Sequence, residues 1–108
     1  MTRLSKRNFG ILGGSFDPPH VGHLKISEIA KKKYKLKKIF WAITKKNPFK
    51  RIYRYKLNKR IILSKRLAIK KKYIKIKCYE DKIKSNKTIN LINFFKKKYF
   101  NDQLFFII

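Results

Sequence analysis

The sequence predicts an α/β fold in which an open parallel sheet carries helices on both faces. Short apolar runs, which suit buried strands, alternate along the chain with longer segments whose apolar residues recur at helical spacing. Strands that alternate with helices favour a parallel sheet covered on both sides. The chain has 108 residues, 44% of them hydrophobic, and shows neither an internal repeat nor a linker. We therefore expect a single domain with one core.

The first strand is expected at residues 8–14, where an apolar run ends in two glycines. Pro18 and Pro19 follow shortly after, and two consecutive prolines continue neither a strand nor a helix interior, so this segment is a loop. A helix is then expected at 23–34. Its apolar residues at near-helical spacing are Leu24, Ile26, Ile29 and Ala30.

The second strand is expected at residues 38–44, and a loop marked by Asn47-Pro48 covers 45–51. A second helix is expected at 55–72. Its apolar residues on one face are Leu57, Ile61, Leu63, Leu67 and Ala68. The alternating segment 73–79 is expected to form the third strand.

A third helix is expected at residues 84–99, with Ser85 and Asn86 as candidate N-caps, and a fourth strand at 103–108. That last apolar strand ends the sequence without a turn or polar cap. Its carboxylate would fall where a parallel sheet normally continues into a functional loop, and a buried charge is costly. We therefore expect the sequence to be the N-terminal part of a longer protein.

In open parallel sheets, ligands bind beyond the carboxyl ends of the strands. The first two predicted strands both lead into such loops, and the first loop contains Gly13, Gly14, His20 and His23. Glycines let a backbone approach an anion, free N–H groups at a helix start point at it, and two imidazoles can donate hydrogen bonds to phosphate oxygens. Two structural histidines at a loop–helix junction explain the pattern equally well. A zinc site would need a third ligand, so we assign no metal ligands.

The formal charge is +26, with 31 Lys and Arg against 5 Asp and Glu, and no carboxylate lies between Glu28 and Glu80. Such a surface binds polyanions, nucleic acid above all. The excess is mostly lysine and accompanies many Ile, Asn, Tyr and Phe, which share A/T-rich codons, and compositional drift is the interpretation we favour.

Trp41 and Cys78 are assigned to the core, and the lone thiol excludes an internal disulfide. With no signal peptide and no membrane segment, a cytoplasmic protein is expected.

The segment GGSFDPPHVGHLKISEIA (13–30) resembles the signature of the nucleotidyltransferase superfamily with the H-x-G-H motif. The segment FWAITKKNPFK (40–50) resembles the strand and N-P-[LF]-K loop of bacterial nicotinate mononucleotide adenylyltransferases, and residues 79–108 resemble the segment that follows in that family. The resemblance implies a Rossmann-like nucleotidyltransferase fold, truncated after the fourth strand. Residues 1–108 would be the N-terminal part of a single nucleotidyltransferase domain.

The resemblance also implies a role for each matching residue. His20 and His23 would be catalytic, because they would hold the ATP phosphates and stabilise charge as the α-phosphate is attacked. Contacts to ATP and its phosphates would come from Gly13, Gly14, Ser15, Phe16, Asp17, His20, Gly22, His23 and Lys50. Nicotinate mononucleotide would be bound by Ser15, Lys50 and Thr88.

The implied reaction transfers AMP from ATP to nicotinate mononucleotide, giving deamido-NAD and pyrophosphate, with Mg²⁺ on the triphosphate. Two features depart from the family. Lys87 stands where a Tyr is usual, and the family's Gly-x-Asp motif and late ATP-gripping segment do not follow within these 108 residues, so we expect little or no activity from them alone. The alternatives are a sister enzyme acting on another acceptor such as phosphopantetheine, whose motif usually begins with Thr, and a basic nucleic-acid-binding protein. The oligomeric state is left open.

Overall fold

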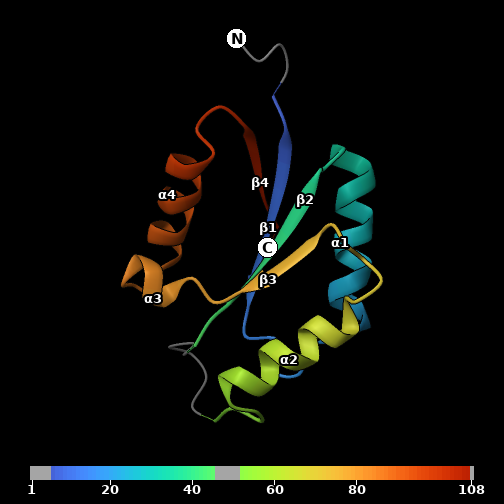
Figure 1. Cartoon of the computed structure of the whole chain (residues 1–108), viewed down its shortest axis with the longest axis vertical. Helices are drawn as coiled ribbons and strands as arrows, with labels where there is room; N and C mark the ends of the chain where they lie inside the picture. The colour runs from blue at the N-terminus through green and yellow to red at the C-terminus, as the bar shows by residue number, and fades with distance from the viewer. Residues whose placement is uncertain (1–5, 46–51, 108) are drawn as a thin grey trace.

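The computed structural model describes residues 6–45 and 52–107, and it confirms the predicted fold class (Figure 1). The described residues form four strands and four helices, which alternate except that the last two helices follow one another directly. Their order is β1 (Asn8–Gly14), α1 (Val21–Tyr34), β2 (Lys38–Ile43), α2 (Leu57–Leu67), β3 (Ile74–Lys77), α3 (Glu80–Ile83), α4 (Thr88–Lys98) and β4 (Gln103–Ile107).

The four strands form one sheet in the order β3-β2-β1-β4, and each neighbouring pair is parallel. The register pairs Gly14 of β1 with Ile43 of β2, so the two inner strands end side by side. Helices α1 and α2 lie on one side of the sheet, and α3 and α4 lie on the other (Figure 1). The loops that follow β1 and β2 consequently leave the sheet at the same edge.

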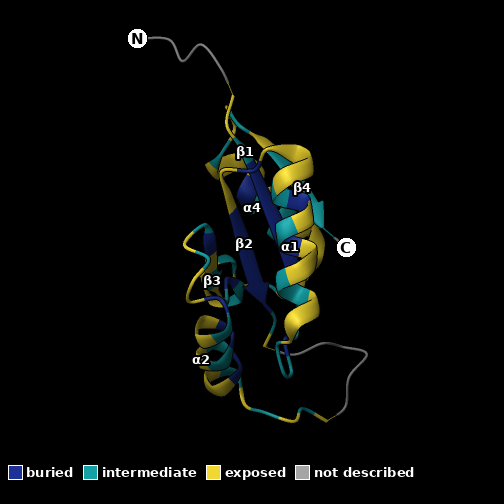
Figure 2. Ribbon diagram, turned by 90° about the vertical axis from the view of Figure 1, so that its right-hand side faces the viewer, coloured by how far each residue is buried: buried dark blue, intermediate teal, exposed yellow. Residues whose placement is uncertain are grey.

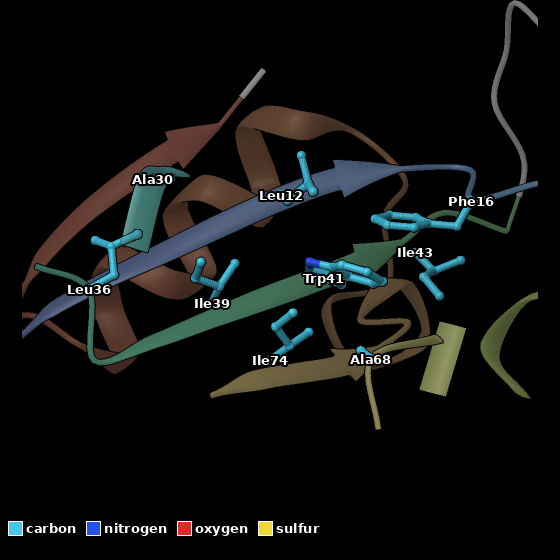
Figure 3. Packing of buried hydrophobic residues seen from close by; sticks show 9 residues of the cluster. All are labelled: Leu12, Phe16, Ala30, Leu36, Ile39, Trp41, Ile43, Ala68 and Ile74. Carbon is cyan, nitrogen blue, oxygen red and sulfur yellow. The ribbon is translucent and has the colours of Figure 1, made fainter. Parts of the chain in front are cut away.

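Alternate side chains of the inner strands build the core on each face of the sheet. Ile39, Trp41 and Ile43 point toward α1 and α2, together with Leu12 of β1 (Figure 3). On the opposite face, a second cluster packs beneath Phe95 of α4. Its buried members are Phe9, Ile11, Phe40, Ala42, Tyr79 and Phe95. Figure 2 shows the resulting contrast between buried inner strands and a largely exposed outer face of α1.

Several element boundaries differ from the sequence prediction. The third strand ends at Lys77, because the next residues turn into the short helix α3, which the sequence analysis did not predict. The assignment of Ser85 and Asn86 as N-caps is wrong, since Lys87 holds the N-cap position of α4 without a side-chain cap bond. Ser85 Oγ instead accepts a hydrogen bond from the backbone N–H of Lys87 (3.1 Å), which stabilises the turn before the helix.

A buried polar contact joins the core to the start of α1. The indole Nε1–H of Trp41 donates to Ser27 Oγ (2.9 Å), and the Ser27 hydroxyl donates to the backbone carbonyl of His23 (2.8 Å). Trp41 and Ser27 are both fully buried, which confirms Trp41 as a core residue, whereas Cys78 is only half-buried. The first turn of α1 is therefore fixed to the centre of the sheet by a satisfied polar pair.

We predict that Ser27→Ala lowers the free energy of unfolding by about 1–3 kcal/mol, because it leaves the buried Trp41 N–H without an acceptor. Ser64→Ala is the matched control. Ser64 is equally buried, but its Oγ has no hydrogen-bond partner within the part of the chain that the structure describes. Its removal should be neutral or stabilising. Urea unfolding of both variants checks this, and equal destabilisation would contradict it.

Candidate functional site

The loops at the shared ends of β1 and β2 bring most of the predicted site residues to one edge of the sheet. Gly13 and Gly14 end β1, and the backbone N–H of Thr44 donates to the Gly14 carbonyl (2.9 Å), which holds the two strand ends together. His20 and His23 stand at the start of α1. Lys50 lies outside the described residues.

His20 and His23 form a reciprocal cap on the first turn of α1. The backbone N–H of Gly22 donates to His20 Nδ1 (3.0 Å), and the backbone N–H of His20 donates to His23 Nδ1 (3.0 Å). This is the geometry of a capping box, built here from two imidazoles in place of the usual hydroxyl and carboxylate. The helix begins at Val21, earlier than predicted, because this cap satisfies its first N–H groups.

The cap fixes the tautomer of both rings. A nitrogen that accepts a backbone N–H carries no hydrogen, so in each neutral imidazole the proton lies on Nε2. The two ring centroids are 4.1 Å apart. The site thus presents two neighbouring Nε2–H donors, which suit an anionic oxygen.

Gly22 is required by the cap itself. A Cβ at this position would lie 2.7 Å from Cε1 of His20, closer than van der Waals contact allows. The contact to ATP that the resemblance implies for Gly22 stays a prediction. The structure shows a separate reason for a glycine here, since the His20 ring folds back over this residue.

Phe16 packs against the ring of His23. Its ring is buried and stacks on His23, with centroids 4.4 Å apart, and on Trp41 at 5.1 Å. The residue has a positive φ of 52°, a backbone conformation that costs a non-glycine residue about 1–2 kcal/mol. Burial of the aromatic ring, which contributes about 1.5–3 kcal/mol, offsets that strain. The loop is therefore held with its phenylalanine inside the core.

Asp17 acts as a tether for the chain that precedes α2. Its carboxylate accepts the backbone N–H groups of Arg54 (2.6 Å) and Tyr55 (2.8 Å). The contact to ATP that the resemblance implies for Asp17 stays a prediction. Arg60, one turn into α2, was not singled out by the sequence analysis. It is buried, and its guanidinium donates to the backbone carbonyls of Ser15 (2.9 Å) and Thr44 (2.7 Å).

A cavity of about 750 Å³ opens on the other face of the sheet, between the ends of the strands and α3 and α4. Gly13, Gly14 and Thr88 line it, so the structure brings the glycine turn and the predicted Thr88 together. His20 and His23 are not among the residues that line it. The volume lies within the range of small-molecule sites. The remaining lining residues are Ile11, Ala42, Ile43, Thr44, Tyr79, Glu80, Ile83, Ser85, Asn86, Lys87, Leu91, Ile92, Phe106 and Ile107.

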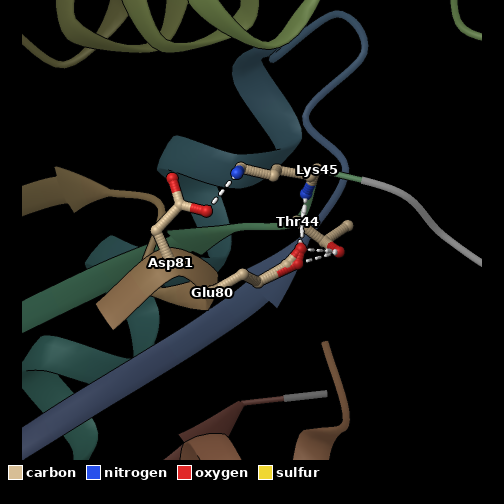
Figure 4. Close-up of polar contacts among 4 residues, drawn as sticks. All are labelled: Thr44, Lys45, Glu80 and Asp81. Carbon is tan, nitrogen blue, oxygen red and sulfur yellow. Dashed lines mark hydrogen bonds and ion pairs between the residues drawn. The ribbon is translucent and has the colours of Figure 1, made fainter. Parts of the chain in front are cut away.

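Acidic side chains of α3 hold the end of β2 at the mouth of this cavity (Figure 4). The Glu80 carboxylate accepts the hydroxyl of Thr44 (3.0 Å) and the backbone N–H of Lys45 (2.7 Å). Lys45 also forms an ion pair with Asp81. Neither carboxylate was predicted to contribute, because α3 itself was not predicted.

Burial, followed by the nearby positive charge that His20 can carry, holds the pKa of His23 below its ordinary value. His23 is therefore a neutral hydrogen-bond donor at pH 7.

Within residues 6–45 and 52–107, no group of three or more His, Cys, Asp or Glu side chains is arranged to hold a metal ion. In the same residues, the helices are too short or too polar to cross a membrane.

Comparisons with known proteins agree with the observed fold. The cytidylyltransferase-like family model matches residues 11–108. A protein of Pelagibacter ubique named "Probable nicotinate-nucleotide adenylyltransferase" is 54% identical over 92 residues, which are 85% of this chain and 51% of that protein. The chain thus spans about half the length of this relative.

Two solved structures share the fold. A Vibrio parahaemolyticus structure that carries the name nicotinate-nucleotide adenylyltransferase superposes with a TM-score of 0.77 at 16% identity, covering 94% of this chain and 60% of that one. The Plasmodium falciparum nicotinic acid mononucleotide adenylyltransferase complexed with NaAD gives a TM-score of 0.73 at 20% identity, covering 93% and 50%. At these identities the likeness concerns the fold.

We predict that His23 titrates below 6.5 and that His20→Ala raises its pKa, because the variant removes the neighbouring positive charge. In the wild type, the unfolded chain binds a proton at His23 at a higher pH than the folded chain does. The free energy of unfolding therefore falls as the pH drops from 6.5 toward the pKa of His23 in the folded state. NMR titration of the ring signals checks both points, which is simple because the chain has 2 histidines. Lys25→Ala, on the exposed side of α1, is the control. A His23 midpoint at or above 6.5 would contradict the prediction.

Proposed function

This chain belongs to the cytidylyltransferase-like family, and from that membership we propose that it provides the nucleotide-binding part of a nicotinate-nucleotide adenylyltransferase. The reaction is the transfer of AMP from ATP to nicotinate mononucleotide, which gives deamido-NAD and pyrophosphate. The observation that carries the proposal is the pair of Nε2–H donors of His20 and His23 beside the glycine turn. The name of the Pelagibacter relative supports the choice of acceptor.

In this proposal the histidines bind the ATP phosphates and stabilise the charge that develops during in-line attack on the α-phosphate. Such a displacement needs positioning and electrostatic stabilisation, and it needs no serine or cysteine nucleophile. The Nε2–H groups of both imidazoles donate hydrogen bonds to the phosphate oxygens, and their Nδ1 atoms remain engaged in the helix cap, so the donors are pre-organised. Gly13, Gly14 and Ser15 allow the backbone to approach the phosphates.

The acceptor mononucleotide occupies the cavity on the α4 side in this proposal, with Thr88 beside its pyridine ring. The cavity and the histidine pair flank the same strand ends, so an acceptor phosphate leaving the cavity reaches the edge where the ATP phosphates lie. Lys87 also lines the cavity and supplies a cation where the family usually has an aromatic residue. Lys50 belongs to the same proposal as a phosphate contact.

Mg²⁺ enters as part of the substrate, bound to the triphosphate, where it neutralises charge on the leaving pyrophosphate. The histidine pair fits that arrangement, because it offers hydrogen-bond donors to the phosphate oxygens, while the phosphates themselves coordinate the metal ion. The cytoplasm, which supplies ATP, is the proposed location.

We predict that the chain binds ATP·Mg and that His23→Ala weakens this binding roughly tenfold or more, since each charge-assisted hydrogen bond contributes about 1.5–3 kcal/mol. Isothermal titration calorimetry of wild type, His23→Ala and His20→Ala measures it, with Lys25→Ala as the matched control on the same helix. The protein translated from the longest open reading frame that contains this segment is then assayed for pyrophosphate release from ATP and nicotinate mononucleotide. Unchanged ATP affinity in both histidine variants would contradict the assignment.

A second capacity, nonspecific binding of nucleic acid, is favoured by one surface feature. A groove of about 520 Å³ runs along the edge strand β3 and the end of α2, and half of its ten lining residues are lysines. They are Lys65, Lys71, Lys72, Lys75 and Lys77. Among the described residues, none that lines the groove is acidic, and Lys71 pairs with Glu28 of α1 (3.0 Å). Such a surface attracts phosphates and releases their counterions.

We predict that the double variant Lys75→Gln/Lys77→Gln weakens binding of a labelled single-stranded DNA oligonucleotide and lowers the salt slope by about 0.7 for each lysine that contacts a phosphate. Fluorescence anisotropy at several salt concentrations measures both. Lys96→Gln/Lys97→Gln, an exposed pair on α4, is the charge-matched control. Equal losses in the two double variants would show that only net charge matters and that the groove has no special role.

A further inference from the structure

Arg60 is a buried cation that donates hydrogen bonds to backbone carbonyls of three separate segments. Only 2% of the residue is exposed. Nε donates to Tyr55 (3.0 Å), Nη1 donates to both Ser15 (2.9 Å) and Thr44 (2.7 Å), and Nη2 donates to Lys45 (3.1 Å). The guanidinium therefore touches the loop after β1, the end of β2 and the entry to α2 at the same time.

A buried charge needs a reason beyond packing, because an apolar residue of similar volume usually stabilises a core at least as well. Four charge-assisted hydrogen bonds and the Tyr53 ring, whose centroid is 4.6 Å from the guanidinium carbon, compensate the loss of hydration. The guanidinium can also fix the relative positions of its partners. Its planar group of donors holds several carbonyls at fixed separations, which the single ammonium of a lysine cannot do.

The segments that Arg60 joins carry the two halves of the proposed site. Ser15 directly precedes Phe16, whose ring stacks on His23. Thr44 lines the cavity on the other face and is held there by Glu80. The guanidinium thus connects the loop that supports the histidine pair with the strand end that lines the cavity.

We propose that Arg60 is a positioning residue, which sets the spacing between the histidine pair and the acceptor cavity and so aligns the two nucleotides. The alignment part of this inference rests on the proposed function, whereas the clamp itself is a property of the fold. Small misplacements of reacting groups are expensive, since a shift of about 1 Å can reduce a rate roughly a hundredfold.

The test compares Arg60→Lys with two controls on the same helix. Arg66→Lys makes the same chemical change at an exposed position, and Ile61→Val trims the core without touching a loop carbonyl. Each variant is measured by thermal unfolding, by amide hydrogen exchange and by its affinity for ATP·Mg. Arg60→Gln is a second substitution at the same site.

We expect Arg60→Lys to accelerate exchange at Thr44 and His20 selectively and to weaken ATP·Mg binding roughly tenfold. Arg66→Lys should change neither quantity, and Ile61→Val should lower the thermal midpoint without a selective change at these amides. The proposal is overturned if Arg60→Lys behaves like Ile61→Val at an equal loss of stability, or if neither Arg60 variant folds. If the wild type does not bind ATP·Mg, the proposed function fails, and the exchange data alone decide whether Arg60 is a clamp.

Discussion

Strands β1 and β2 run parallel and end together at Gly14 and Ile43, and this shared end is the constraint on which the rest of the structure depends. Parallel strands deliver their loops to one edge, where the sheet ladder no longer supplies partners for the backbone. Side chains must therefore hold those loops. Asp17 supplies acceptors for backbone N–H groups, and Arg60 supplies donors for backbone carbonyls. The edge becomes a rigid platform because both kinds of backbone group are satisfied there.

The scarcity of acidic residues makes their placement informative. The chain has 5 Asp and Glu residues against 31 Lys and Arg, and every one of the five has a structural contact. Asp17, Glu80 and Asp81 hold the carboxyl edge of the sheet, whereas Glu28 and Asp102 pair with Lys71 and Arg7. Carboxylates are thus found where geometry needs an acceptor. The lysines show no such restriction, and compositional drift stays our prediction for their number.

The sequence predicted the strands and the long helices because their burial follows directly from apolar periodicity, and it located the histidine loop because glycines and histidines there break that periodicity. It missed features that depend on tertiary contact. Arg60 lies in a segment rich in basic residues, and a cation in such a segment is typical of an exposed surface. The short helix α3 has no apolar repeat to reveal it, and its role depends on Glu80 meeting Thr44 across 36 positions. Local patterns therefore predict the order of the strands and long helices, but they do not predict the contacts between loops.

The spacing of the two histidines has a physical explanation in the helix cap. The backbone N–H of His20 lies opposite the side chain three residues later, which is the reach of a capping box, and the ring of His20 needs an intervening residue without a Cβ. Each imidazole uses Nδ1 for the helix cap, and its Nε2–H lies outside that cap. A hydroxyl or carboxylate cap would satisfy the helix, but it would not leave a second donor fixed at the same edge. The motif therefore starts the helix and also places two donors where the proposed phosphate site needs them, and the protonation of His23 is coupled to the stability of α1.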